Sequence, residues 1–341
     1  MFLFGRKKIT GLDMGHSAVK IAESNNGKKI TFLACYPIDN GISHSENSRS
    51  DQVKQIFKEI TKDRSFTDKR IFNSVQDESV MVKYMELPLL SKEEMKTALP
   101  IETERVIPFN LDEIIVNYKK VSVLSDDPGK MGITAAVIPK KLLDHRKDIF
   151  TVFSSNHVEK MTIPSTMAFE KINHYSAYFN KNHITVFIDI GAKFTNISLG
   201  RNNEIYHSRF FSHGVIDFNE AFMKSKRSDM EKADKIRRNY YIGKDRDIYF
   251  IASLEIWAKE VKRTLEYYRR RLTTVPLIID KVLLSGGGSL MNGMKEYVEK
   301  ISETETHLDK LEIPGIDAIR KKQNISPDEL ALFKVVLGLA L

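Results

Sequence analysis

The pattern of apolar and polar positions divides the chain into two halves that begin alike. Each half opens with short, β-rich runs separated by turn residues, which is typical of strands. Later stretches carry apolar residues three and four positions apart, which predicts amphipathic helices. The predicted strands cover 8–14, 18–23, 29–38, 70–75, 80–87, 112–123, 131–138, 183–190, 194–200, 204–211 and 281–285, and the predicted helices cover 51–62, 91–105, 140–154, 216–224, 229–238, 248–271, 290–301 and 326–341.

Local signals predict where some helices begin and end. Ser91 followed three residues later by Glu94 is a capping box, so a helix begins there, and Pro108 prevents it from continuing. Ser326 followed by Pro327 predicts the start of the last helix, with serine as the cap and proline in the first turn.

Composition narrows the class of protein. A chain of 341 residues with 42% hydrophobic and 29% charged residues is globular and long enough for about two domains. The single cysteine, Cys35, excludes a disulfide framework within the chain and favours a reducing compartment. We find no run of 18 apolar residues and no signal-peptide core, so we expect a cytoplasmic protein.

The chain is moderately basic, with 53 lysines and arginines against 45 acidic residues. This excess of basic residues could bind nucleic acid or an anionic membrane surface. However, no aromatic-basic RNA motif and no zinc-finger spacing accompanies the charge. We therefore interpret it as a solvated surface and predict no nucleic-acid partner.

Two aspartate–glycine turns carry the candidate chemistry. Residues 12–15 and 188–191 both read apolar-Asp-apolar-Gly at the end of a predicted strand, about half the chain apart, which predicts duplicated domains. Glycine lets the backbone approach a phosphate, and the turn amides form an anion nest. Asp13 and Asp189 could hold Mg²⁺ directly or through water, while Lys20 could neutralise phosphate charge.

A third motif lies near the end of the chain. An apolar strand at 281–285 is followed by Gly286, Gly287 and Gly288 and then by a predicted helix. Three glycines leave a bare backbone surface on which a nucleoside could lie, at a helix N-terminus that favours phosphate.

Together these motifs resemble those of the actin-like ATPase superfamily. The resemblance implies an α/β actin-like ATPase fold: two facing α/β domains with a duplicated core, nucleotide between them, and an inserted α+β subdomain in the first. It implies ATP and Mg²⁺ as cofactors, with Asp13 and Asp189 as the catalytic and metal-binding residues. Segment 230–237 resembles the Ala-Glu-x-Ile-Lys helix of bacterial members, where an acid and a lysine approach the nucleoside. The implied cofactor-binding residues are Gly15, His16, Ser17, Lys20, Gly191, Lys193, Thr195, Asn196, Asp234, Arg237, Gly286, Gly287 and Gly288.

A narrower resemblance covers nearly the whole chain. Residues 85–94 followed by 107–109 are similar to the inserted subdomain of the PilM family of type IV pilus assembly, and the opening at 4–8 and the close at 337–340 are similar to that family too. The implied division is 1–85 plus 160–182 for the first domain, 86–159 for the inserted subdomain, 183–214 plus 272–341 for the second domain, and 215–271 for a helical subdomain.

The family resemblance implies a cytoplasmic ATP-binding scaffold at the inner face of the inner membrane, reached through partners. The expected partner is the N-terminal cytoplasmic tail of a PilN-like membrane protein, held in a groove between the first domain and the insert. The resemblance leaves open three further partners: other pilus platform proteins, the assembly ATPases and a second copy of this chain in a homo-oligomer. Ile163 stands where such proteins often place an aspartate, so we expect slow ATP hydrolysis or none.

Two other functions on the same fold compete with the scaffold. An FtsA-like division protein would form filaments. A small-molecule kinase would need a further carboxylate as base towards a substrate hydroxyl, and no motif for one stands out.

Overall fold

The computed structural model describes residues 8–38, 46–64, 69–150, 159–274 and 276–341. Contacts between residues divide the chain into two compact units. Unit 1 consists of Met1–Gln76, Leu142–Phe179 and Asp309–Leu341, and unit 2 of Asp77–Lys141 and Asn180–Leu308. Each unit has its own sheet and its own core, as the repeated pattern of the two halves predicts.

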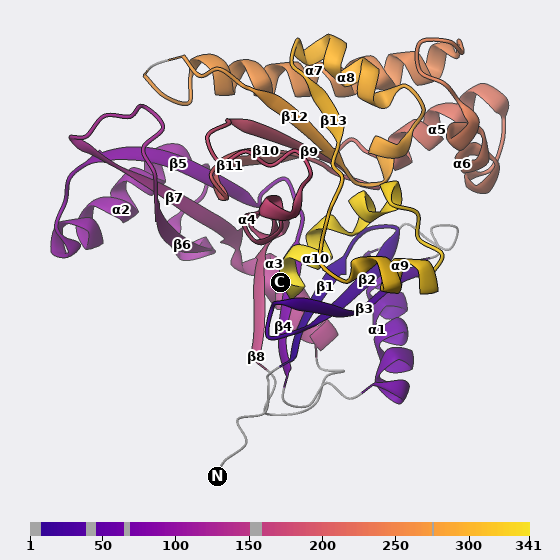
Figure 1. Cartoon of the computed structure of the whole chain (residues 1–341), viewed down its shortest axis with the longest axis horizontal. Helices are drawn as coiled ribbons and strands as arrows, with labels where there is room; N and C mark the ends of the chain where they lie inside the picture. Colours follow the sequence, from indigo (N-terminus) through magenta and orange to yellow (C-terminus); the bar gives the residue numbers. More distant parts are fainter. Residues whose placement is uncertain (1–7, 39–45, 65–68, 151–158, 275) are drawn as a thin grey trace. The chain divides into compact units, whose positions relative to one another are not determined.

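Unit 1 is built on a five-stranded sheet in the order β3-β2-β1-β4-β8 (Figure 1). The first three strands form an antiparallel meander, and the last two run parallel to the central strand. The strands are β1 (Lys8–Met14), β2 (Ala18–Asn25), β3 (Lys29–Pro37), β4 (Lys69–Val75) and β8 (Glu159–Pro164), and the helices are α1 (Glu46–Asp63), α3 (Lys140–Phe150), α4 (Phe169–Ile172), α9 (Ile316–Lys322) and α10 (Lys334–Ala340).

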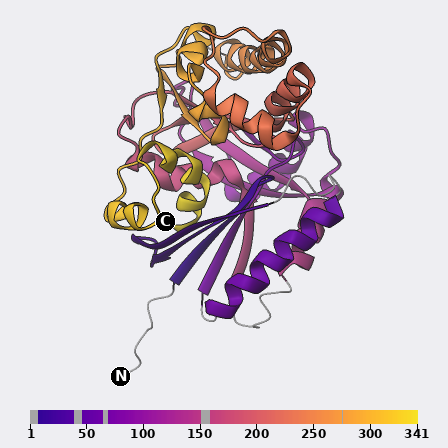
Figure 2. The same ribbon diagram turned by 90° about the vertical axis from the view of Figure 1, so that its right-hand side faces the viewer.

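Both faces of this sheet are covered, because its strands present apolar residues on alternate sides. Leu12 of β1 and Phe57 of α1 belong to one buried cluster, and Figure 2 shows α1, in violet, lying along that face. On the other face, Gly11 admits α10 closely, since a Cβ at Gly11 would lie 2.5 Å from the carbonyl oxygen of Val336.

Unit 2 is built on an eight-stranded sheet in the order β13-β12-β9-β10-β11-β5-β7-β6. Helices α5, α7 and α8 share a hydrophobic cluster with its β9–β12 part. The strands are β5 (Met81–Pro88), β6 (Ile114–Val121), β7 (Lys130–Pro139), β9 (Thr185–Ile190), β10 (Thr195–Arg201), β11 (Glu204–Phe211), β12 (Lys281–Ser285) and β13 (Thr306–Leu308), and the helices are α2 (Lys92–Val106), α5 (Val215–Lys226), α6 (Met230–Asn239), α7 (Ile248–Arg270) and α8 (Met294–Ser302).

The segment predicted as an inserted subdomain joins this second sheet. Val82 of β5 pairs with Ser208 of β11, and its backbone N–H donates to the Ser208 hydroxyl at 3.1 Å. β7 pairs along the whole of β5, and β6 lies outside β7 at the sheet edge (Figure 1). Contacts therefore divide residues 86–159 between the units after Lys141, whereas the sequence suggested one subdomain of the first domain.

Some of the predicted helix ends agree with the structure and others differ. The capping box of Ser91 and Glu94 is present, and that helix ends at Val106. The helix predicted from 290 instead begins at Met294, because Gly293 adopts a left-handed φ of +81° that no helix accommodates. The predicted last helix begins as a 3₁₀ segment, Asp328–Phe333, before α10.

In the part of the chain that the structure describes, no helix is both long and apolar enough to cross a bilayer. The N-terminal resemblance at 4–8 falls almost entirely on residues 1–7, which lie outside the described residues.

Candidate functional site

The first aspartate–glycine turn lies between β1 and β2 in unit 1. Asp13 is buried at the end of β1 and pairs across the hairpin with Lys20. The Ser74 hydroxyl, on the parallel neighbour β4, donates to Oδ1 of Asp13 at 2.7 Å, and the Lys20 ammonium lies 3.6 Å from Oδ2. The carboxylate is thus held in one orientation by Ser74, which the sequence did not single out.

One arginine that the sequence did not single out bonds this turn, and a second lies within electrostatic reach of it. Arg49, near the start of α1, donates from Nη2 to the carbonyl oxygens of Met14 at 3.1 Å and Gly15 at 2.7 Å. Arg146 of α3 interacts electrostatically with both Arg49 and Asp13. The strand order could have indicated Arg49, because a helix that follows β3 begins at the edge where β1 also ends.

The other predicted residues of this turn are more exposed. Gly15 and His16 are half-buried, and Ser17 is exposed. The carbonyl oxygen of Ser17 accepts a hydrogen bond from the backbone N–H of Ile38 at 2.9 Å, which ties the turn to the end of β3.

The second turn and the triple glycine meet at one edge of the sheet in unit 2. β9 and β12 are parallel neighbours, so Asp189 and Ser285 lie in register at their carboxyl ends. The Ser285 hydroxyl donates to Oδ1 of Asp189 at 3.0 Å. A Cβ at Gly286 would lie 2.6 Å from that same oxygen, so the glycine is required for this approach. The structure therefore joins two motifs that are nearly a hundred residues apart in the sequence.

Glycines also bring α5 against the second turn. A Cβ at Gly214 would lie 2.6 Å from the carbonyl oxygens of both Gly191 and Ala192. The first amides of α5 donate to these two carbonyls, from Val215 at 3.0 Å and from Ile216 at 2.9 Å. These two N–H groups are consequently used within the fold.

The structure gives Thr195 and Asn196 internal partners. Thr195 is fully buried, and its hydroxyl donates to the carbonyl of His213 at 2.6 Å and accepts from the Trp257 indole N–H at 2.9 Å. Asn196 is buried as well, and its amide bonds the Arg209 carbonyl. Thr195 thus joins β10 to α7 and Asn196 joins β10 to β11, whereas Lys193 beside them is exposed.

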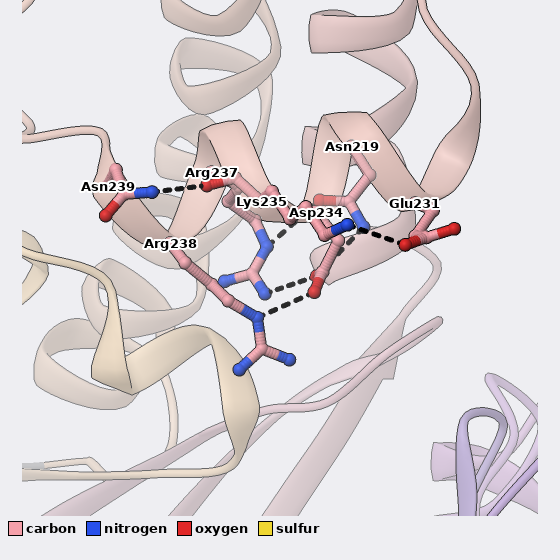
Figure 3. Close-up of polar contacts among 7 residues, drawn as sticks. All are labelled: Asn219, Glu231, Asp234, Lys235, Arg237, Arg238 and Asn239. Atoms are coloured by element: carbon pink, nitrogen blue, oxygen red, sulfur yellow. Dashed lines mark hydrogen bonds and ion pairs between the residues drawn. The ribbon is translucent and has the colours of Figure 1, made fainter.

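Asp234 and Arg237 of α6 form a polar network with each other (Figure 3). Arg237 is buried and donates to the Asn219 side-chain oxygen at 2.9 Å and to Oδ1 of Asp234 at 2.6 Å. Arg238 donates to Oδ2 of Asp234 at 2.7 Å. Burial raises the pKa of Asp234, but the hydrogen bonds from both arginines outweigh it and lower that pKa to about 2.

The end of α6 lies beside the loop that carries the triple glycine. The Asn292 side chain donates to the carbonyl of Arg238 at 3.3 Å, and the backbone N–H of Ile242 donates to the carbonyl of Asn292 at 2.9 Å. Unit 2 thus joins the end of α6 to the loop that follows Gly286–Gly288.

Asp13 and Asp189 are the candidate residues for a nucleotide-bound cation. Within the described ranges, no group of three or more histidines, cysteines or acids could hold a metal ion. Mg²⁺ on a nucleotide needs only one or two carboxylates, since it keeps several waters. Asp13 in unit 1 and Asp189 in unit 2 are the two carboxylates predicted for this role.

The comparison with protein families decides among the three functions. Residues 11–341 match the family described as "Type IV pilus assembly protein PilM". The chain belongs to this family. This membership confirms the predicted family and favours the pilus scaffold over the division protein and the kinase.

Solved structures confirm the predicted fold. A chain of the "PilM-PilN type IV pilus biogenesis complex" is 22% identical, with 98% of each chain covered and a TM-score of 0.76. The ethanolamine utilization protein EutJ from Carboxydothermus hydrogenoformans is 13% identical over 99% of this chain and 90% of its own, with a TM-score of 0.54. MreB5 of Spiroplasma citri, solved bound to ADP, is 12% identical over 96% and 94%, with a TM-score of 0.51. The fold is that of the actin-like ATPases.

Proposed function

We propose that the chain is a nucleotide-binding scaffold of type IV pilus assembly that binds the N-terminal tail of a PilN-like membrane protein. The observation that carries the nucleotide part is the junction of Asp189, Ser285 and Gly286 at one sheet edge. Ligands of α/β folds bind outside the carboxyl ends of strands, where glycine-rich turns admit phosphate and sugar. The ADP-bound relative of the same fold supports this placement.

In this function, the aspartate–glycine turn of each unit serves as a phosphate-binding turn, and Gly286–Gly288 lie beside the nucleoside of ATP. Asp13 of unit 1 and Asp189 of unit 2 are the carboxylates that would hold Mg²⁺, and the ion would neutralise phosphate charge when bound. Lys20 and Lys193 are the cations for the phosphates. Four predicted residues support the site without contacting the nucleotide, because each is already hydrogen-bonded inside unit 2. They are Thr195, Asn196, Asp234 and Arg237. Hydrolysis is slow or absent, since half-buried Ile163 offers no carboxylate to position water.

The partner part rests on the surface of α2. Of the 15 residues of this helix, all of them described, Thr103 alone is buried. Leu89 is 63% exposed, Ile101 50% and Val106 41%, and Ile115 of the neighbouring β6 is 42% exposed. Ile101 and Val106 belong to α2, whereas Leu89 precedes it and Ile115 belongs to β6. Exposed apolar side chains that form a patch mark interaction sites. An extended or helical peptide tail with apolar anchors is a ligand that suits such a surface.

The PilM–PilN complex supports this choice of occupant, as its chain shares the fold over its whole length. A PilN-like tail would order on binding and would hold the scaffold at the cytoplasmic face of the inner membrane. Platform proteins, assembly ATPases and a second copy of the chain are further partners that the sequence left open.

Calorimetric titration with ATP and Mg²⁺ tests the nucleotide part. We expect Asp13→Ala and Asp189→Ala each to weaken binding at least tenfold, or about 1.4 kcal/mol. Glu303→Ala, far along the chain from either turn, serves as the control and should leave the affinity unchanged. Equal affinity in all four proteins would refute the site.

A further inference from the structure

Almost all of the net positive charge of the chain lies in one segment of unit 2. Residues 224–271 carry 15 lysines and arginines against 8 acidic residues, a net charge of +7, and the whole chain carries +8. This segment contains α6 and α7. Each basic side chain of α6 pairs with an acid of the same helix or of its N-cap, as Figure 3 shows in part. The basic residues of α7 follow a different pattern.

The long helix α7 has two faces with the same spacing of three and four residues, which places the members of each face on one side of the helix. The inner face is buried and consists of Phe250, Leu254, Trp257, Val261, Leu265 and Tyr268. The opposite face, which we call the outer stripe, is exposed and consists of Tyr249, Ala252, Ile256, Lys259, Arg263, Glu266 and Arg270. The outer stripe is about 30 Å long. A stripe with this spacing is a surface on which a second helix can pack.

The first part of the outer stripe is apolar. Tyr249 is 50% exposed and Ile256 57%, and Ile248, which precedes Tyr249, is 77% exposed. These side chains lie within about two turns of one helix. Exposed apolar side chains that form a patch mark interaction sites.

The second part of the outer stripe is basic. Lys259 and Arg263 are exposed, and within the described ranges neither forms an ion pair with an acidic side chain. The acids nearby, Glu260 and Glu266, are already paired with arginines, at 2.5 and 2.8 Å. Complementary charge at an interface favours the right partner and speeds association. A partner that complements this part of the stripe therefore carries acidic side chains.

We propose that the outer stripe of α7 binds a helical segment of another protein, and that the face of this segment is apolar in one half and acidic in the other. Its apolar half packs on Tyr249 and Ile256, and its carboxylates pair with Lys259 and Arg263. This acidic helix is a second partner, distinct from the tail proposed for α2. The inference depends on neither that tail nor the nucleotide.

An anionic membrane fits the outer stripe less well than an acidic helix does. A helix that lies in a membrane surface buries an apolar face in lipid and carries its basic residues on the opposite face. The apolar face of α7 is packed inside unit 2, where Trp257 is fully buried. The outer stripe instead changes from apolar to basic along the helix axis.

Titration of a synthetic acidic helix into the full chain tests the proposal. The probe has about 22 residues, the length of the outer stripe, with leucines at the facing positions of one half and glutamates at those of the other. We expect Ile256→Glu and Arg263→Glu each to weaken its binding at least tenfold. Two matched controls, Ile101→Glu on α2 and Lys321→Glu on α9, also replace exposed residues and should change the affinity less than threefold.

Charge reversal on both sides makes the test specific. A probe with lysines in place of its glutamates should bind the double variant Lys259→Glu, Arg263→Glu at least tenfold more tightly than it binds the wild type. Raising the salt from about 50 to about 300 mM should weaken the acidic probe, because salt screens exposed charges. Thermal melting shows whether each variant is folded.

The remaining outcomes would overturn the proposal. The acidic helix is the wrong occupant if the probe does not bind the wild type, or if the two α7 variants bind it as the wild type does. Vesicles of phosphatidylcholine and phosphatidylglycerol that bind the wild type but not Arg263→Glu, without binding of the probe, would make the stripe a membrane surface. Self-association of the wild type that Ile256→Glu abolishes and the probe does not compete with would make the occupant a second copy of the chain.

Discussion

Lys334 and Asp309 form an ion pair deep inside unit 1. Their side chains are 1% and 0% exposed, and the Lys334 ammonium donates directly to Oδ2 of Asp309. Ser176 donates to the other carboxylate oxygen at 2.5 Å. Ser176 also bridges to Leu311, so the segment that leaves unit 1 and the segment that returns to it lie side by side at this pair.

Breaking this pair on one side should destabilise the chain strongly. Lys334→Met leaves the buried Asp309 carboxylate without its cation, at an expected cost of about 3–5 kcal/mol. Removing both charges, in Lys334→Met with Asp309→Leu, should cost less than the single change, because no charge is left unpaired. Urea denaturation of the three proteins measures this. A single variant as stable as the wild type would contradict the buried pair.

Thr195 should matter for stability and not for nucleotide affinity. Thr195→Val keeps the shape of the side chain but leaves the His213 carbonyl and the Trp257 N–H without a partner. We expect a loss of at least about 2 kcal/mol in the free energy of unfolding, since each of the two buried groups left unpaired costs about 1–3 kcal/mol. The dissociation constant for ATP should stay within threefold. A large loss of ATP affinity in a folded variant would instead indicate that Thr195 contacts the nucleotide phosphates.

Gly286 should tolerate no side chain. Gly286→Ala places a Cβ 2.5 Å from the carbonyl of Ile190 at a φ of +80°, so both a clash and backbone strain oppose it. Gly243→Ala is the matched control, because its φ is +88° with nothing within 4 Å. The control should lose about 1–2 kcal/mol from strain alone. Gly286→Ala should lose more and should also lose ATP binding, as denaturation and calorimetry would show.

The contribution of the Asp234 network to folding stability should decrease as the pH is lowered. Its folded-state pKa of about 2 lies below the ordinary value of 3.8, so its contribution is complete above about pH 4 and declines as the pH falls towards 2. Asp234→Asn should therefore lower the urea midpoint at pH 6, and the difference from the wild type should shrink at pH 3. A constant difference across this range would argue against ionised Asp234.

The sequence predicted the fold because strand and helix periods are local and its two turns repeat. The resemblance to one superfamily also grouped Asp189 with Gly286, and the structure places them at the ends of parallel neighbouring strands. The sequence could not show that Thr195 turns inward, because which hydroxyl is buried depends on Trp257, 62 residues away. Nor could it find Arg146, whose place depends on packing of α3, or the pairing of β5 with β11, which joins segments over a hundred residues apart.

Binding of the partner tail is the most direct test of the scaffold function. A synthetic peptide of the N-terminal cytoplasmic tail of the PilN from the same organism is titrated into the full chain. The comparison variants are Ile101→Glu on α2 and Ile248→Glu on α7, both of which replace well-exposed isoleucines. We predict that the tail binds the wild type, that Ile101→Glu weakens it at least tenfold, and that Ile248→Glu changes it less than threefold. No binding to the wild type, or the same loss in both variants, would contradict the scaffold proposed for this chain.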